Sequence, residues 1–197
     1  MKKGLISLLV IVLLVVIVGG SMIGSYNKIV KMEEEVSAAW SQVENVYQRR
    51  ADLIPNLVNT VKGYASHERE TLEAVINARA KATQTTIDPT KLDAASLQQF
   101  QANQSELSSA LGRLMVVMEQ YPDLKANQNF RDLQVQLEGT ENRITVERRA
   151  FNDTAKMFNS YIRQFPKNII AAIFNFEKKA YFEAELGAEK APEVNFE

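Results

Sequence analysis

The N-terminal segment of the chain is uncharged over a length that constrains the fold more than any other feature. After Lys3 the next charged residue is Lys28, and the residues between them are almost all aliphatic or small. A helix needs about twenty such residues to cross the hydrocarbon core of a bilayer. We therefore predict that residues 1–25 form a transmembrane signal anchor and that residues 4–24 contact the lipid bilayer.

A cleaved signal peptide is the alternative to this anchor. Gly19, Gly20 and Ser21 resemble the small residues of a cleavage site, which follows a shorter apolar region in such peptides. However, the apolar run resumes at Met22 and Ile23, and no clear pair of small residues follows it. We therefore favour an uncleaved anchor.

Lysines flank both ends of the apolar segment, with Lys2 and Lys3 on one side and Lys28 and Lys31 on the other. Positive residues near a span favour its cytoplasmic side. Because the lysines are balanced, the additional charge of the terminal amine decides the orientation. It predicts that the N-terminus lies inside and that the rest of the chain forms an extracytoplasmic domain.

The composition excludes several classes of function. The chain has no Cys and one His, which excludes a disulfide framework, a thiolate metal site and any site that needs two imidazoles. Its 23 basic and 24 acidic residues give a net charge of −1, which argues against nucleic acid as a partner. Phosphate-binding loops and nucleophile motifs are missing from the sequence. We expect no enzymatic activity, no bound cofactor and no metal.

One cluster of residues is the best candidate for a metal site in this sequence. His67 and Glu70 lie three residues apart, and Glu73 follows three residues later. The remaining ligands would all have to be carboxylates, because the chain offers no second His and no Cys. Acidic residues are also typical of the first turn of a helix, and we favour that interpretation.

Apolar residues recur in steps of three and four along the rest of the chain, which is typical of helices with one buried face. The pattern predicts a helix that ends near Gly63 and further helices at about residues 66–84, 92–119 and 127–163. Short connections place successive helices antiparallel. We predict an all-α fold in which residues 26–165 form an up-and-down antiparallel four-helix bundle. In its last helix the predicted core positions are Phe130, Leu133, Leu137, Ile144, Phe151, Ala155, Phe158 and Ile162.

Pro55 lies inside the first of these helices and has two interpretations. Proline lacks the N–H of other residues and disrupts a helix interior, so it can kink one long helix. It is tolerated in a first turn, so a second helix capped by Asp52 can also begin here. We favour the kinked single helix, but the sequence leaves both open.

The C-terminal tail, residues 166–197, is unusually apolar and contains four Phe. Such residues rarely stay together in solvent. We predict that the tail docks on the bundle. A surface for another protein, or for self-association, is the alternative.

Two arginines and two asparagines are candidates for polar sites. Arg49 and Arg50, together with Asp52, can bind a carboxylate or phosphate, but we favour an internal ion pair with Glu138 or Glu141 on the last helix. The asparagines, seven residues apart on that same helix, can line a polar pocket. These asparagines are Asn152 and Asn159, and we favour the interpretation in which their side chains are buried and fix the helix register.

Gly139 lies in the middle of the last predicted helix. A glycine there costs about 1 kcal/mol relative to Ala. We therefore predict that another helix approaches closely at this position, near Tyr47 or Trp40.

Several strings of sequence, spread from residue 26 to the tail, are long enough to be specific. They are Tyr26-Asn27, QRRADLIPNLV from Gln48, YPDLKAN from Tyr121, QLEGTENRI from Gln136, Phe165-Pro166 with Asn168, and YFE from Tyr181. Together these strings resemble the LemA family of bacterial proteins. Two positions depart from the family pattern, because Asn175 stands where Gly is expected and Phe151 stands where Tyr is usual.

The resemblance implies a membrane anchor followed by an up-and-down four-helix domain outside the cytoplasm, in the bacterial cytoplasmic membrane. It does not imply a particular reaction. Members of the family are implicated in envelope processes, magnetosome formation and association with membrane metallopeptidases. We predict a single-pass membrane-anchored interaction or scaffold protein whose partners are other membrane or envelope proteins, and self-association stays open. The alternative is an accessory or sensor domain that regulates a membrane protease. The candidate motif and interaction residues are Tyr26, Asn27, Arg49, Arg50, Asp52, Leu53, Pro55, Asn56, Tyr121, Pro122, Glu138, Gly139, Glu141, Asn142, Arg143, Asn152, Asn159, Phe165, Pro166, Asn168, Phe176, Tyr181 and Phe182.

Overall fold

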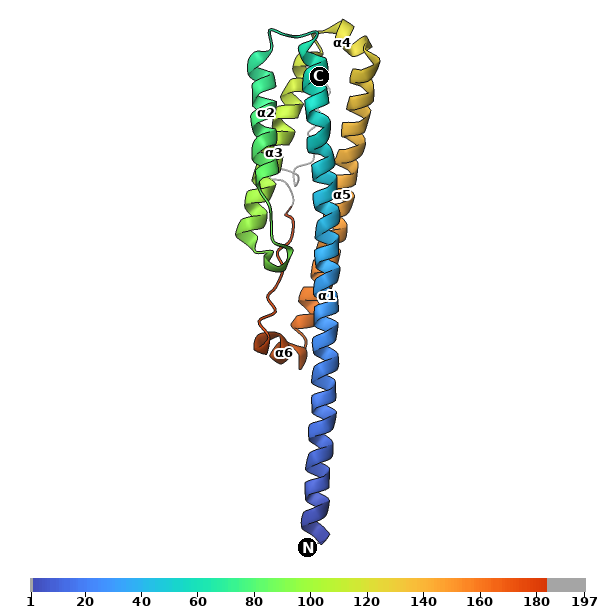
Figure 1. Ribbon diagram of the computed structural model, residues 1–197, viewed down its shortest axis with the longest axis vertical. Coiled ribbons are helices and arrows are strands. Elements are labelled where there is room, and N and C mark those ends of the chain that lie inside the picture. The colour runs from blue at the N-terminus through green and yellow to red at the C-terminus, as the bar shows by residue number, and fades with distance from the viewer. Residues whose placement is uncertain (1, 184–197) are drawn as a thin grey trace, which may run out of the picture.

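The computed structural model describes residues 2–183, and every regular element in that range is helical (Figure 1). The predicted all-α class is therefore confirmed. In chain order the elements are α1 (Lys2–Lys62), α2 (Arg69–Gln84), the 3₁₀ turn η1 (Pro89–Lys91), α3 (Ala94–Met118), α4 (Pro122–Ala126), α5 (Gln128–Ile162) and α6 (Lys167–Ile173).

α1 is 61 residues long and has two parts with opposite surroundings. The large apolar side chains described between Ile6 and Ile23 are exposed, whereas Ile29 is the first of a series that is fully buried. Within the described residues, α1 contains the one segment that is long and apolar enough to cross a membrane. One uninterrupted helix therefore leads from the predicted anchor into the body and crosses the predicted boundary at residue 25.

The four long helices run side by side, and the chain alternates its direction along them (Figure 1). α1 packs mainly along α5, α2 mainly along α3, and α1 also contacts α2. α4 lies at the end of the body farthest from the N-terminus, and α6 lies at the end nearest the exposed part of α1. After α6 the chain turns back and runs along the body in extended form.

The buried apolar residues form two clusters stacked along the body, which we call the proximal core and the distal core by their distance from the exposed part of α1. The proximal core consists of Ile29, Val36, Trp40, Val43, Tyr47, Ile87, Leu92, Leu97, Phe100, Ile144, Phe151, Ala155, Phe158, Ile162, Ile170, Ala171 and Phe182. The distal core consists of Ile54, Leu57, Val58, Val61, Ala65, Leu72, Val75, Ala78, Ala82, Leu107, Ala110, Leu114, Met118, Leu124, Phe130, Leu133 and Leu137. All eight core positions predicted for the last helix are buried.

Pro55 lies inside α1, so the interpretation in which a new helix begins there is wrong. Proline cannot donate a hydrogen bond to the carbonyl oxygen four residues earlier, which belongs to Ala51. The Nε of Arg79 in α2 donates to this oxygen at 2.7 Å. α2 therefore supplies the donor that the proline lacks. Asp52 caps no helix, and its carboxylate accepts a hydrogen bond from Gln48 at 2.7 Å.

Two aspartates shape the connection between α2 and α3. The carboxylate of Asp93 accepts hydrogen bonds from the backbone N–H and the hydroxyl of Ser96, both at 2.8 Å, and these bonds lower the pKa of Asp93 below its ordinary value. The hydroxyl and the backbone N–H of Thr90 donate to Asp88 and lower its pKa in the same way. This connection carries Ile87 and Leu92 into the proximal core.

The predicted helix boundaries are close to those observed, and the structure adds three short elements, η1, α4 and α6. The short helix α4 begins at Pro122, in the connection where the sequence pattern predicts no helix. A proline suits a first helical position because its fixed φ matches the helix and its missing N–H would have no partner there.

Candidate functional site

A buried arginine lies between the two hydrophobic cores. Arg50 of α1 is 2% exposed, and its Nη1 donates to the Glu141 carboxylate of α5 and to the Ser108 hydroxyl of α3, each at 2.9 Å. Its Nη2 donates to the side-chain and backbone oxygens of Gln104 at 2.6 and 3.3 Å. Three helices therefore meet at one charged group. We call Arg50, Gln104, Ser108 and Glu141 the polar layer.

The predicted internal ion pair is thus present, but it involves only one of the two neighbouring arginines. Arg49 is exposed, and Asp52 bonds to Gln48 rather than to an arginine. Glu138 is also exposed and accepts a hydrogen bond from within α5. Arg49 and Asp52 therefore do not join Arg50 in the polar layer, because neighbouring residues of a helix point in different directions.

A groove of 350 Å³ opens beside the polar layer, between α1, α3, α5 and the tail. Much of its lining is polar and includes Gln98, Gln101, Ser105 and Arg148. The backbone carbonyl oxygen of Glu183 accepts hydrogen bonds from the Arg148 guanidinium at 2.9 Å and from the Gln101 amide at 3.2 Å. Two side chains that line the groove therefore hold one backbone carbonyl of the chain's own tail.

Two asparagines of α5 bind the tail as a neighbouring β-strand would. Asn159 donates to the Lys179 carbonyl oxygen and accepts from the Lys179 N–H, both at 2.8 Å. Asn152 makes the same pair of bonds to Phe182, at 2.9 and 2.8 Å. We call Asn152 and Asn159 the asparagine clasp.

The spacing of the clasp follows from backbone geometry. Seven residues of α-helix rise about 10.5 Å, and three residues of extended chain cover about 10 Å. Asn152 and Asn159 therefore match Phe182 and Lys179 along the tail. The prediction that these asparagines fix helix register is wrong, because their partners are the backbone of the tail and the Tyr181 hydroxyl.

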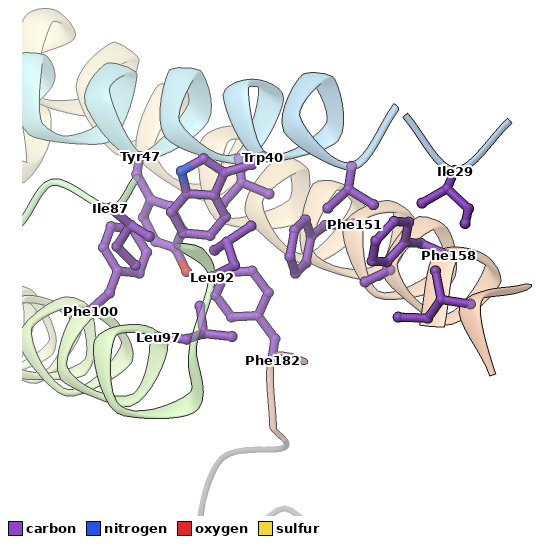
Figure 2. Packing of buried hydrophobic residues seen from close by; sticks show 14 of the residues in the cluster. Ile29, Trp40, Tyr47, Ile87, Leu92, Leu97, Phe100, Phe151, Phe158 and Phe182 are labelled. Carbon is purple, nitrogen blue, oxygen red and sulfur yellow. The ribbon is translucent and has the colours of Figure 1, made fainter. Parts of the chain in front are cut away.

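The clasp places the ring of Phe182 inside the proximal core (Figure 2). This ring stacks on Trp40 with centroids 5.9 Å apart and meets the edge of Phe151 at 5.5 Å. The Arg148 guanidinium covers the same ring at 4.9 Å. The predicted docking of the tail is thus confirmed up to residue 183, and residues 184–197 lie outside the described residues.

Lys179 is a second buried cation, 4% exposed. Its Nζ donates to the Glu33 carboxylate of α1 and to the Thr90 carbonyl oxygen of η1, each at 2.7 Å. The ring of Phe158 lies 5.6 Å from the same nitrogen. One tail side chain therefore connects α1, η1 and α5 inside the proximal end of the body.

The remaining predicted residues lie away from the groove and the clasp. Near the start of the body the ring of Tyr26 contacts Phe174 and Phe176, with centroids 4.7 and 5.8 Å apart. Asn175 between them has φ 57°, a left-handed conformation that favours Gly and that Asn tolerates. This conformation accounts for the glycine expected there. Asn27, Asn56, Asn142, Arg143, Phe165, Pro166 and Asn168 are exposed, and Leu53 packs against the distal core.

At the far end of the body, the Tyr121 hydroxyl donates to the Glu68 carboxylate at 2.8 Å, which raises the pKa of Tyr121. Pro122 begins α4. His67 is exposed, and among residues 2–183 no three His, Cys, Asp or Glu side chains form a group that could hold a metal ion.

The prediction of a tight helix contact at Gly139 is wrong. A Cβ added there would meet no atom within 4 Å, and Gly139 is exposed on α5. Helical periodicity places residue 139 beside the buried Thr140 but on the solvent side of the helix.

The comparisons with known proteins identify a family for this chain. The family model described as LemA family matches residues 39–196. This chain belongs to the LemA family. It is 28% identical over 162 residues to Protein LemA of Metamycoplasma hominis, covering 82% of this chain and 70% of that protein. It is also 28% identical over 189 residues to Magnetosome protein MamQ 2 of Paramagnetospirillum magneticum, covering 87% of this chain and 70% of that protein. The exposed apolar part of α1, which is long and apolar enough to cross a membrane, agrees with a membrane-associated LemA protein.

The strings that carry the LemA resemblance now have structural roles. QRRADLIPNLV contains Arg50 and Pro55, QLEGTENRI contains Glu141, and YFE contains Phe182. The region matched by the LemA model includes the polar layer and the clasp and excludes the apolar part of α1.

Sequence reasoning missed four residues that organise this LemA body: Arg79, Gln104, Arg148 and Lys179. For Arg79 a signal exists, because a proline inside a helix leaves an unpaired carbonyl that requires a donor from elsewhere. For Lys179 the signal is weaker, namely a basic residue in an apolar tail. Gln104 and Arg148 look like ordinary polar positions on helices, so no pattern distinguishes them.

Proposed function

We propose that this LemA protein is a membrane-anchored interaction or scaffold module, which presents the groove beside the polar layer to an extended segment of another envelope protein. The observation that carries the proposal is the contact of Glu183 with Arg148 and Gln101, because it is an example of extended backbone bound in this groove. Backbone recognition is suited to a scaffold, since it accepts segments of different sequence.

The continuity of α1 supports the membrane part of this proposal. One helix contributes the exposed apolar segment, the proximal core and Arg50 of the polar layer. The body is therefore attached to its anchor without a flexible linker. A module held in this way keeps its groove at a fixed height and direction relative to the bilayer, which favours repeated contact with other membrane proteins.

Site-specific photo-crosslinking in native membranes tests the proposal. A photoreactive residue replaces Ser105, which lines the groove, and a matched variant carries it at Val135, which is exposed on α5 outside the groove. We expect the position-105 variant to form a crosslink to a membrane or envelope protein, at a segment identified by mass spectrometry, and the position-135 variant to lack it. Equal crosslinking at both positions, or none at position 105, would contradict the proposal.

The same experiment separates the alternative functions. Crosslinks between two copies of this chain at position 105 would support a self-associating scaffold. A single membrane protease crosslinked there would support the regulatory alternative.

The orientation, with the body outside the cytoplasm, has its own test. Protease added to spheroplasts should digest the body, and a body that stays intact would show the opposite orientation.

A further inference from the structure

The end of the body nearest the exposed part of α1 carries an apolar surface of its own. Phe165 is 80% exposed, Ile169 48%, Ile173 57% and Phe174 51%. We call these four residues the foot. They lie on α6 and its flanks, and Figure 1 places α6 beside α1 where the body ends.

α6 has two faces. Ile170 and Ala171 are buried in the proximal core, which fixes the direction of the helix. Ile169 and Ile173 lie one turn apart on the opposite side and are exposed. A short helix held in this way presents a fixed apolar face, and an exposed apolar group of this kind marks an interaction surface.

The position of the foot along α1 indicates what covers it. Ile23 is the last large exposed apolar residue of the apolar segment, and Tyr26 follows three residues later, about 4.5 Å along the helix axis. Tyrosines at the end of a membrane span lie at the level of the lipid headgroups. Because the Phe174 ring contacts Tyr26 at 4.7 Å, this part of the foot lies at the same level.

Basic side chains lie at the same end. The ammonium groups of Lys28 and Lys167 lie 5.3 and 4.2 Å from the ring centroid of Tyr161. Positive charge beside an apolar face is typical of segments that lie in the headgroup region of a bilayer.

We propose that the foot is a second membrane contact, inserted into the headgroup region of the bilayer that α1 enters. This inference rests on the membrane anchoring in the proposed function. Two contacts, one spanning and one on the surface, would prevent the body from tilting about α1. They would also fix which side of the body faces the bilayer.

The chain contains no Cys, so single cysteines can be labelled without a background. The test uses the full chain in phosphatidylcholine–phosphatidylglycerol vesicles. Its variants are Ile169→Cys, Ile173→Cys, Leu13→Cys and Val135→Cys, each labelled with an environment-sensitive fluorophore. The replaced side chains are all exposed, so unchanged far-UV circular dichroism is expected. Lipids that carry a nitroxide at a shallow or a deep acyl carbon then report the depth of each label.

We expect the shallow nitroxide to lower emission at positions 169 and 173 by about twofold, because interfacial apolar faces insert about 5–10 Å. Position 13 should respond to the deep nitroxide, and position 135 to neither. If the labels at positions 169 and 173 are unquenched, as at position 135, while the label at position 13 is quenched, the proposed membrane contact of the foot is wrong and the anchor stands. An unquenched position 13 would overturn the anchor, and the foot with it.

Discussion

The two cores of the body are similar in size but are made in different ways. The distal core is mainly aliphatic, and nearly all of its residues come from helices. The proximal core is rich in aromatic rings and requires Ile87, Leu92 and Phe182, which lie outside helices. A helical bundle can therefore be closed at one end by helix packing alone and at the other only by an extended segment bound to side chains.

The difference has a consequence for stability, because the proximal core depends on an extended tail segment that side chains hold in place. Lys179 contacts Glu33, and Phe182 stacks on Trp40. The polar layer lies between the two cores. Changes that release the tail should open the proximal core first.

Phe182→Ala should have the largest effect. Removing a buried Phe costs about 3–5 kcal/mol because of lost burial and the cavity that remains. The free energy of unfolding, measured by urea titration in detergent with circular dichroism, should fall by this amount. Val135→Ala is the control, since Val135 is 67% exposed on α5 away from the foot, and a change of about 0.5 kcal/mol or less is expected there. Equal losses in both variants would contradict the role of the tail in the core.

Asn159→Ala should rank second. It leaves the buried N–H and carbonyl of Lys179 without their partners, and such unsatisfied groups cost about 1–3 kcal/mol. The same titration measures the loss. Asn142→Ala on the exposed side of α5 is the control and should change little. A loss for Asn159→Ala no larger than that of the control would mean that the clasp does not hold the tail.

Glu141→Ala tests the polar layer between the cores. It removes the charge partner of the buried Arg50, a change that costs about 3–5 kcal/mol for fully buried pairs. The Glu141 side chain is 53% exposed, so solvent reduces the loss, and we expect about 1–2 kcal/mol. Glu138→Ala provides the control on the same helix. A Glu141→Ala variant as stable as this control would show that solvent, rather than Glu141, stabilises the charge of Arg50.

A double-mutant cycle tests whether Arg79 of α2 compensates for the N–H that Pro55 lacks. Arg79→Met removes the donor to the Ala51 carbonyl and should cost about 1 kcal/mol. In a Pro55→Ala background the new backbone N–H can bond to Ala51, so the same change should cost less. The cycle measures this coupling from four unfolding free energies. An equal cost in both backgrounds would show that Arg79 does not compensate for the proline.

Gly139→Ala should have the smallest effect and the opposite sign. A Cβ meets open space there, and Ala is favoured over Gly in a helix by up to about 1 kcal/mol. Gly112→Ala on α3 is the companion variant, because that position is open as well. Both should raise the midpoint of thermal unfolding. Destabilisation at Gly139 alone would restore the idea of a tight contact.

The distal core could be predicted from the sequence because helical periodicity determines it. Phe130, Leu133 and Leu137 recur in steps of three and four, and all three are buried. The proximal core could be predicted only in part. Phe151 and Phe158 follow the same pattern, but nothing periodic marks Ile87 or Phe182, because extended segments have no helical repeat.

Among the site residues, an internal ion pair between the two neighbouring arginines and Glu138 or Glu141 of the last helix could be predicted, but the sequence left open which arginine and which glutamate form it. The clasp could not be predicted in the same way. Asn159 bonds to backbone atoms 20 residues later, and backbone atoms are the same at every residue, so no side-chain type identifies the partner. The prediction of a close helix approach at Gly139 failed for a related reason. A glycine on an open helix face looks the same in the sequence as a glycine in a tight contact.

Hydrogen exchange measured by mass spectrometry on an Asn152→Ala/Asn159→Ala variant tests most directly whether the clasped tail completes the proximal core. The full chain in lipid nanodiscs is compared with the unchanged chain. The account predicts faster exchange in residues 29–47, 87–100 and 144–162, with residues 54–82 and 107–137 still protected. Equal acceleration in both halves, or unchanged protection of the proximal half, would contradict it.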